Sequence, residues 1–181
     1  ERCDGRPGHA PAALAELAGR LAWTAVIELA LGVDRADVAD GAHWIYFPEP
    51  EFPFYRVGVP SNVCPALAPP GCSSLSIEFS HRPGTPIPAV DDLRDAAVAG
   101  LTRARILRPD DRIVAADIAL LDPAYVLFDE RRTPAVSEAL ARLSRAGIDS
   151  IGRFGLWTYS YMERAIMDGR DAARRAAERA R

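Results

Sequence analysis

Lysine is absent from this chain of 181 residues, so all 22 basic side chains are arginine. Against 25 acidic residues they leave a formal net charge of −3 at pH 7. Proteins that bind nucleic acids neutralise phosphates with an excess of positive charge, so this balance argues against a nucleic-acid partner. The missing lysine and the abundant alanine fit a GC-rich genome and indicate no function.

Long apolar runs are also missing. The nearest one, TAVIELALGV (24–33), is well short of the ~20 residues that a membrane helix needs, and it contains Glu28. Charged residues interrupt the N-terminus and no hydrophobic region follows, so it lacks the form of a signal peptide. Three cysteines without framework spacing fit a reducing compartment. We therefore predict a cytoplasmic protein without a membrane span.

Common catalytic motifs are absent as well. The chain has no H-E-x-x-H, no C-x-x-C, no G-x-S-x-G and no Walker A sequence. We predict no metal site, with Cys64, Cys72 and His81 as the one conceivable ligand group. No residue stands out as a catalytic acid, base or nucleophile.

Apolar periodicity predicts an α+β domain, in which helices cover a mainly antiparallel sheet. Residues that alternate between apolar and polar predict strands over 23–33, 43–47, 54–59, 73–80, 112–121 and 124–129. Helical spacing predicts helices over 11–21, about 90–104, and from Thr133 as N-cap to Gly147. The proline-rich segment 60–72 is predicted to be a loop.

Residues 147–173 carry the most specific pattern. They predict a strand at 148–151, a glycine-flanked turn at 152–155 and a helix with Ser160 and Glu163 in a capping box. Met162, Ile166, Gly169 and Ala173 follow along one helical face. A turn before a helix N-terminus exposes N–H groups that can meet an anionic or carbonyl-rich ligand. The alternative is an αβ unit that only packs well.

The order G-R-F-G-x-W-x-Y-x-x-M-E-x-A-I-x-x-G within this segment resembles the closing segment of three flavoprotein families. These are the FAD-dependent amine oxidases, the protoporphyrinogen oxidase-like proteins and the UDP-galactopyranose mutases. HWIYFPEPEFPFYRVGVPSN (43–62) and SLSIEFS (74–80) resemble strands of the substrate domain in the protoporphyrinogen oxidase-like members. The resemblance covers most of the chain, but only 152–169 is specific.

The resemblance implies that FAD lies along the C-terminal turn and helix start. The cofactor-binding residues it implies are Gly152, Arg153, Phe154, Gly155, Trp157, Tyr159, Ser160 and Met162. Arg153 would offset charge on the flavin or the substrate and so tune flavin reduction. A surface arginine that pairs with Asp149 or Glu163 is the alternative.

The candidate substrate-binding residues are Tyr55, Arg56 and Tyr125. Arg56 lies in the apolar strand FPFYRVGV, where a guanidinium needs a carboxylate, a phosphate or a ligand as its partner. In the mutase-like families a comparable strand supplies an arginine beside the flavin and the substrate. An internal ion pair with a residue such as Glu78 is an equal alternative. Tyr125 either faces the substrate cavity or packs in the core.

Flavoproteins of these families begin with a G-x-G-x-x-G turn that holds the FAD pyrophosphate, and this chain contains none. We therefore expect a C-terminal portion of a longer protein. Residues 1–146 would form part of the substrate-binding domain, and 147–181 a flavin-contacting strand–turn–helix. That last part would return to an upstream FAD-binding domain of the same polypeptide.

Three functions follow from this interpretation. The first is the substrate-binding part of an FAD-dependent oxidoreductase acting on a small molecule, with this chain inactive by itself. The second is a nucleotide-sugar mutase in which Arg56 and Arg153 clamp the diphosphate. The third is a non-catalytic binding module that keeps the substrate-domain fold without FAD.

Overall fold

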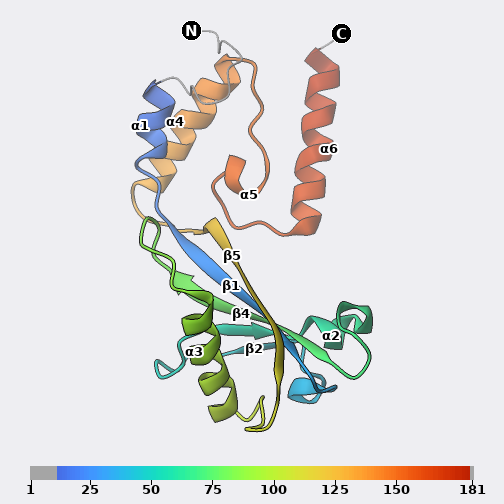
Figure 1. The fold of residues 1–181 in the computed structure, drawn as a ribbon. Coiled ribbons are helices and arrows are strands. Elements are labelled where there is room, and N and C mark those ends of the chain that lie inside the picture. The colour runs from blue at the N-terminus through green and yellow to red at the C-terminus, as the bar shows by residue number, and fades with distance from the viewer. Residues whose placement is uncertain (1–11, 180–181) are drawn as a thin grey trace. The chain divides into compact units, whose positions relative to one another are not determined.

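A computed structural model describes residues 12–179 of the chain (Figure 1). The chain divides into two compact units. Thr24–Ala124 forms one, and the flanking stretches Glu1–Trp23 and Tyr125–Arg181 together form the other. The assignment of substrate binding to residues 1–146 and of flavin contact to residues 147–181 stays a prediction.

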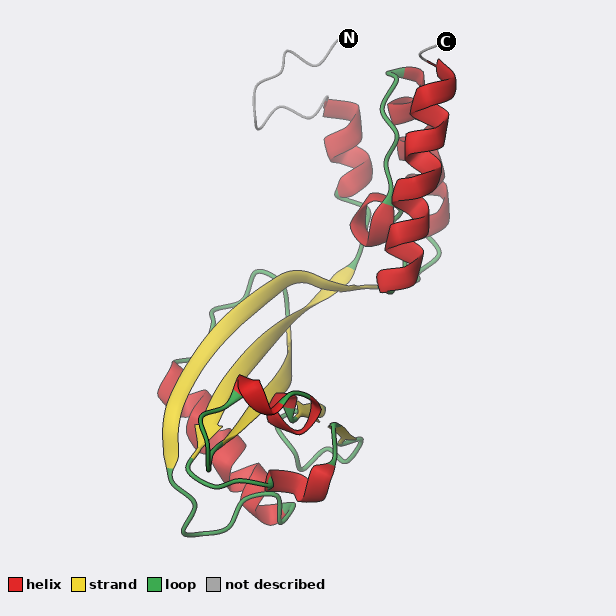
Figure 2. Ribbon diagram, turned by 90° about the vertical axis from the view of Figure 1, so that its right-hand side faces the viewer, coloured by secondary structure: helices red, strands yellow, loops and turns green. Residues whose placement is uncertain are grey.

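Five strands build a single sheet in the order β2-β3-β4-β1-β5 (Figures 1 and 2). Their bounds are β1 Trp23–Val33, β2 Trp44–Tyr46, β3 Arg56–Gly58, β4 Ser73–His81 and β5 Ile113–Val126. The pairs β1–β4, β2–β3 and β3–β4 are antiparallel. The predicted α+β class with a mainly antiparallel sheet is therefore confirmed.

One face of this sheet is the core face. The register pairs Leu29 with Ile77, and both side chains are fully buried. Helix α3 (Val90–Arg103) covers this face, as Figure 2 shows, and contributes buried Leu93, Ala97 and Leu101. The residues between the core positions of each strand point the other way, because side chains alternate along a strand. We call that second side the open face of the sheet.

The segment predicted as a loop at 60–72 contains two short helices, α2 (Pro60–Val63) and η2 (Pro65–Leu67). Each of these helices has proline at its first position. Proline suits a helix start because the N–H group that it lacks would have no hydrogen-bond acceptor within the helix there. A further turn, η1 (Val38–Gly41), includes Ala39 and Asp40 in left-handed conformations. Asn62 holds this turn by donating to the carbonyls of Val38 and Ala42 at 3.0 and 2.9 Å.

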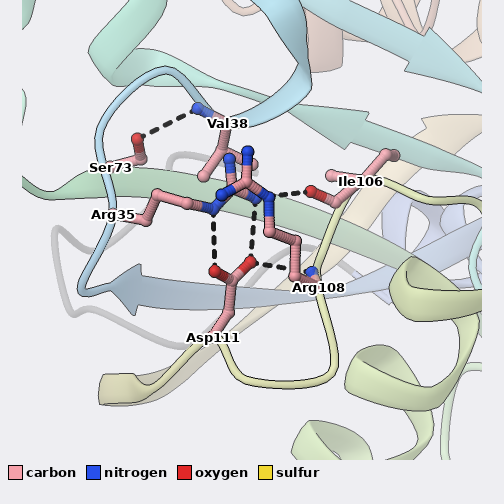
Figure 3. A network of polar contacts seen from close by, with 6 residues as sticks. All are labelled: Arg35, Val38, Ser73, Ile106, Arg108 and Asp111. Carbon is pink, nitrogen blue, oxygen red and sulfur yellow. Dashed lines mark hydrogen bonds and ion pairs between the residues drawn. The ribbon is translucent and has the colours of Figure 1, made fainter.

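A polar network fixes the chain after α3 to the end of β1 (Figure 3). Arg35 Nε and Nη2 donate to the two carboxyl oxygens of Asp111 at 2.7 and 2.8 Å. The same guanidinium donates to the Ile106 carbonyl at 2.9 Å, and the Arg108 N–H donates to Asp111 at 2.8 Å. The Asp111 side chain is only 5% exposed, so its charge depends on these donors.

The other unit is helical. It holds α1 (Ala12–Ala18), α4 (Arg132–Arg145), the single turn α5 (Gly152–Gly155) and α6 (Met162–Arg179). Helix α1 packs on α4, and α5 contacts α6. Gly147 follows the C-cap residue of α4 and has a φ of 77°, the left-handed conformation that ends many helices. The sequence predicted that this glycine ends the helix. No helix of residues 12–179 is long and apolar enough to cross a membrane.

Several further local predictions were wrong. The strands expected at 112–121 and 124–129 form one strand, β5, because Pro123 lies on a sheet edge where its missing N–H leaves no gap in the ladder. Residues 148–151 form no strand, and the turn expected at 152–155 is the helical turn α5. Helix α4 starts before Thr133, so Thr133 is not its N-cap.

The capping box expected at Ser160 was also wrong. Helix α6 begins at Met162, which moves the N-cap position to Tyr161. The Ser160 hydroxyl donates instead to the Tyr161 carbonyl at 3.5 Å. The structure therefore places Ser160 just before the helix and not at its cap.

Candidate functional site

Arg56 and Glu78 form an ion pair on the open face of the sheet. The register aligns the two residues directly across β3 and β4. Arg56 Nε donates to Glu78 Oε1 at 2.9 Å, and the Tyr55 hydroxyl donates to the other oxygen, Oε2. Glu78 is buried, while the Arg56 side chain keeps 22% of its surface exposed. Glu78, the internal partner considered for Arg56, therefore does pair with it, and the same carboxylate accepts from the Tyr55 hydroxyl.

Two aromatic residues of β2 lie beside Arg56. Trp44 and Tyr46 share the open face with it, because the register pairs them with Gly58 and Arg56. The Arg56 guanidinium carbon lies 4.8 Å from the Trp44 ring centre and 6.0 Å from that of Tyr46. Trp44 is 53% and Tyr46 65% exposed. The open face thus presents aromatic rings held by a cation–π contact.

A second carboxylate adds to the charge of this face. Glu28 of β1 is directly paired with Glu78 of β4, and it accepts a hydrogen bond from the Ser76 hydroxyl at 2.7 Å. Like charges directly opposite each other on neighbouring strands repel, and Arg56 offsets only one of the two. By formal charge, the cluster of Glu28, Glu78 and Arg56 sums to −1.

Arg153 lies at the other candidate site, in the unit that contains α5 and α6. Its guanidinium carbon lies 5.1 Å from the Tyr125 ring centre and 5.9 Å from that of Phe154. Its Nη1 donates to the Ser160 carbonyl at 3.4 Å. The structure therefore brings Arg153 together with Tyr125, a residue that the sequence assigned to the substrate. Asp149, considered as a partner of Arg153, pairs instead with Arg175 and Arg179.

The same unit contains further pairs of aromatic rings. Trp157 packs edge-on against Trp23 at 5.9 Å, and Tyr159 stacks on Phe128 at 5.1 Å. Trp157 has a φ of 46°, a conformation that bulky residues rarely adopt and that is concentrated at functional sites. Its indole Nε1 is buried and has no hydrogen-bond partner within the described chain. An indole donor in this state indicates a missing acceptor.

Glycine is favoured at each of the two glycine positions of α5 for a different structural reason. Gly152 has a φ of 78°, which favours glycine. Gly155 accepts a hydrogen bond from the Ser150 hydroxyl at 2.9 Å, and a Cβ at this position would lie 2.8 Å from that hydroxyl oxygen. Phe154, between them, is exposed. The glycines therefore shape the turn on which Arg153 and Phe154 are displayed.

Helix α6 turns its charged side toward its own unit. A cavity of about 220 Å³ separates it from the segment 150–156, and four charged residues of α6 line the cavity: Arg164, Asp168, Asp171 and Arg175. Asp168 is the one buried residue among those described in this helix. At ~100° per residue, Met162, Ile166, Gly169 and Ala173 lie on the opposite side. We call these four residues the apolar stripe of α6.

The apolar stripe is largely exposed. Met162 is 86% and Ile166 74% accessible to solvent. A helix normally buries such a stripe and leaves its charged side in water. Within residues 12–179 the arrangement is reversed, so the predicted apolar face of α6 exists but lacks a covering partner in the described chain.

Other chemistry has no support in the described residues. Within residues 12–179, no group of three or more His, Cys, Asp or Glu side chains is arranged to hold a metal ion, and Cys64, Cys72 and His81 form no such group. Cys64 and Cys72 are free thiols. The perturbed acids belong to surface or structural ion pairs: hydrogen bonding by Arg179 lowers the pKa of Asp149, for example.

Comparison with known proteins supports a flavoprotein-like fold through one structural similarity. No protein-family profile matches the chain. The fold is similar to a solved structure of reduced UDP-galactopyranose mutase, with a TM-score of 0.72 and 28% sequence identity over 80% of this chain. The chain spans only 31% of that protein's length. The likeness supports a flavoprotein-like fold, and the mutase is one of the three families that the sequence resembles.

Proposed function

We propose that this chain is the substrate-binding and C-terminal part of an FAD-dependent enzyme. The observation that carries the proposal is the structural likeness to UDP-galactopyranose mutase, which extends over 80% of the chain. The specific G-R-F-G-x-W-x-Y-x-x-M-E sequence at 152–163 supports the same conclusion from the residues. In this interpretation the upstream part of the polypeptide supplies the nucleotide-binding domain.

The residues at 152–162 fit a flavin. The buried Trp157 Nε1–H lacks an acceptor in the described chain, and a flavin ring carries carbonyl oxygens that accept such a bond. Phe154, Tyr159 and Met162 are exposed apolar side chains that a flat ring could cover. Arg153 adds a positive charge beside Phe154, and such a charge near the ring would favour electron density on it. Gly152 and Gly155 leave the backbone at the two ends of α5 free of side chains.

The first candidate reaction is substrate oxidation. When bound, FAD would supply the redox chemistry by accepting hydride from a reduced C–H/C–N centre of the substrate. The chain would position the substrate and exclude water, with Arg153 holding charge near the ring. Tyr55 and Arg56 would form part of the substrate-facing surface. The protein would therefore contribute orientation and electrostatics and no separate catalytic base.

A mutase-like isomerase is the second candidate, and the structural neighbour favours it. It needs basic residues that hold a diphosphate. Arg56 is a poor clamp because Glu78 already neutralises its charge, which leaves Arg153 as the better candidate. This ion pair is the observation that ranks oxidation above isomerisation.

A non-catalytic module is the third candidate. It requires the apolar side of the last helix to be buried within the chain or within a dimer. The exposure of Met162 and Ile166 instead favours a covering domain. The upstream FAD-binding domain of the same polypeptide is the partner that we propose.

The test is the visible absorbance of the natural gene product, followed by denaturation to release its chromophore. We expect FAD, and we expect Arg153→Ala to weaken FAD retention or to slow flavin reduction about tenfold, as loss of ~1.4 kcal/mol would. Arg174→Ala is the matched control, because this exposed arginine lies on α6 with only a 3.9 Å contact to Asp171. A colourless full-length product would contradict the proposal and leave the non-catalytic module.

A further inference from the structure

We infer that the cavity of about 220 Å³ between α6 and the segment 150–156 binds a small zwitterion such as a free amino acid. The cavity lies within the helical unit, and none of the residues that line it is among those assigned to the flavin or the substrate. The inference goes beyond the proposed function and does not depend on it. It rests on two side chains that face the same cavity with opposite charge, Asp168 and Arg175.

Asp168 lines this cavity although it is almost fully buried. Its side chain is 8% exposed, and Arg164 Nε lies 2.8 Å from its Oδ1. Its second oxygen, Oδ2, is buried and has no hydrogen-bond partner among the described residues. A carboxylate can accept up to about four hydrogen bonds, and a buried polar atom that makes none destabilises the fold. The Asp168 carboxylate therefore lacks a donor, which the ammonium group of a ligand in the cavity can supply.

Arg175 brings positive charge to the same cavity. Its Nε lies 3.5 Å from Asp149 Oδ2, and Arg179 Nη2 lies closer to that oxygen, at 2.7 Å. A guanidinium carries several N–H donors, so this long contact leaves Arg175 able to bind a carboxylate. Asp168 and Arg175 are seven residues apart on one side of α6, which is about 10 Å along the helix axis. The long arginine side chain shortens the gap that a small molecule has to bridge.

The charge of the lining selects a ligand without net charge. Arg164 and Arg175 balance Asp168 and Asp171, so the lining is formally neutral. Asp171 already has a partner outside the lining, because Arg170 Nε lies 2.9 Å from its Oδ1. A ligand with a single charge would serve either Asp168 or Arg175 and leave the other unserved. The ammonium and the carboxylate of an amino acid serve both.

The size of the cavity favours a small amino acid. Its volume is that of about seven liquid waters at ~30 Å³ each. Pockets for drug-sized ligands span roughly 300–1,000 Å³, so a nucleotide or a flavin is too large for this cavity. Ile151 and Leu156 complete the lining with apolar surface that suits a short aliphatic side chain. Alanine has this combination of charges and size.

The experiment titrates the natural gene product with L-alanine, propionate and ethylamine. Propionate is alanine without its ammonium group, and ethylamine is alanine without its carboxylate. Ligand-observed NMR and calorimetric titration measure the three affinities. We expect alanine to bind at least about tenfold more tightly than either of the other two, because only alanine can meet Asp168 and Arg175 together.

Two variants test the two ends of the ligand separately. Asp168→Asn should abolish the preference for alanine over propionate, and Arg175→Gln should abolish the preference for alanine over ethylamine. A merely structural role would weaken all three ligands alike. Glu138→Gln is the matched control with unchanged affinities, because Glu138 and Arg142 form an ion pair of the same i,i+4 spacing in the same unit. If Asp168→Asn does not fold, Arg175→Gln decides, since the Arg175 side chain is 48% exposed.

Three results would overturn the inference. They are no saturable binding of alanine, which would mean that water alone fills the cavity, propionate or ethylamine binding as tightly as alanine, or an unchanged preference in a folded variant. Failure here is distinguishable from failure of the proposed function, because the FAD content is measured on the same product. A flavin-containing product that does not bind alanine loses only this site, whereas a colourless product that binds it loses only the flavoenzyme.

Discussion

Arg35 and Asp111 link two distant parts of the chain through a pair of parallel hydrogen bonds. Hydrogen bonding by Arg35 is the main cause that lowers the pKa of Asp111 below its ordinary value, and the Arg108 N–H acts in the same direction. A carboxyl group with a lowered pKa in the folded state stabilises the fold above its unfolded pKa of about 3.9. That contribution is lost as the pH falls through the folded pKa.

We therefore expect Asp111→Asn to reduce the free energy of unfolding at pH 7 by about 2–3 kcal/mol, because Arg35 keeps a partly buried charge without its partner. The variant should also lose part of the fall in stability that the wild type shows below pH 4. Urea unfolding at pH 7 and pH 3 measures both effects. Asp91→Asn is the control, since the Asp91 side chain is 78% exposed. Equal stabilities of Asp111→Asn and wild type at pH 7 would contradict this role.

At the scale of single helices, alanine substitutions at two glycines should change the stability in opposite directions. Gly100 in α3 lies against Phe54, and an added Cβ would be 2.7 Å from Cε1 of this buried ring. Gly169 in α6 has no heavy atom within 4 Å of the same position. We expect Gly100→Ala to destabilise the chain by about 1–2 kcal/mol and Gly169→Ala to stabilise it by about 0.5–1 kcal/mol.

Thermal and urea unfolding of both variants test this contrast. Phe54→Leu combined with Gly100→Ala is the control, because the smaller side chain makes room for the methyl group. If Gly100→Ala were as stable as wild type, the close packing of α3 on Phe54 would be disproved.

The elements that the sequence predicted well are those whose pattern reflects burial within the chain. Strands at 23–33 and 73–80 agree with β1 and β4 to within one residue, because one face of each packs in the core. Residues 148–151 were also predicted to form a strand, with Ile148 and Ile151 as its apolar residues, but they form none. A strand needs a neighbour to pair with, and Ile148 and Ile151 are exposed in the described chain.

The candidate site, like the fold, could be predicted only where the pattern of the sequence reflects packing within the chain. The sequence offered either a ligand or an internal carboxylate such as Glu78 as the partner of Arg56. Aligning the two predicted strands yields the pair with Glu78 only once their register is known. Trp44 and Tyr46 were missed as site residues. Their alternation places them on one face, but no pattern in a single sequence states that this face is uncovered.

At the scale of the whole molecule, the apolar stripe of α6 decides between a complete module and a part of a larger protein. Full burial of a side chain such as Ile166 contributes about 1.5–3 kcal/mol. Its exposure of 74% means that α6 gains almost none of this within residues 12–179. The segment 148–151 likewise pairs with no strand among the described residues. Both features are explained by a covering domain, such as the FAD-binding domain proposed above.

Ile166→Glu tests this explanation because the two interpretations differ in where the side chain lies. In the isolated chain, an exposed position predicts a change in unfolding free energy within about 0.5 kcal/mol. In the natural gene product, a covered stripe predicts a loss of at least 2 kcal/mol or so, since a charge would be buried without a partner. Glu163→Gln, on the same exposed helix but outside the stripe, should be neutral in both. A variant equally stable in both forms would mean that nothing covers α6, and the case for a docked upstream domain would fail.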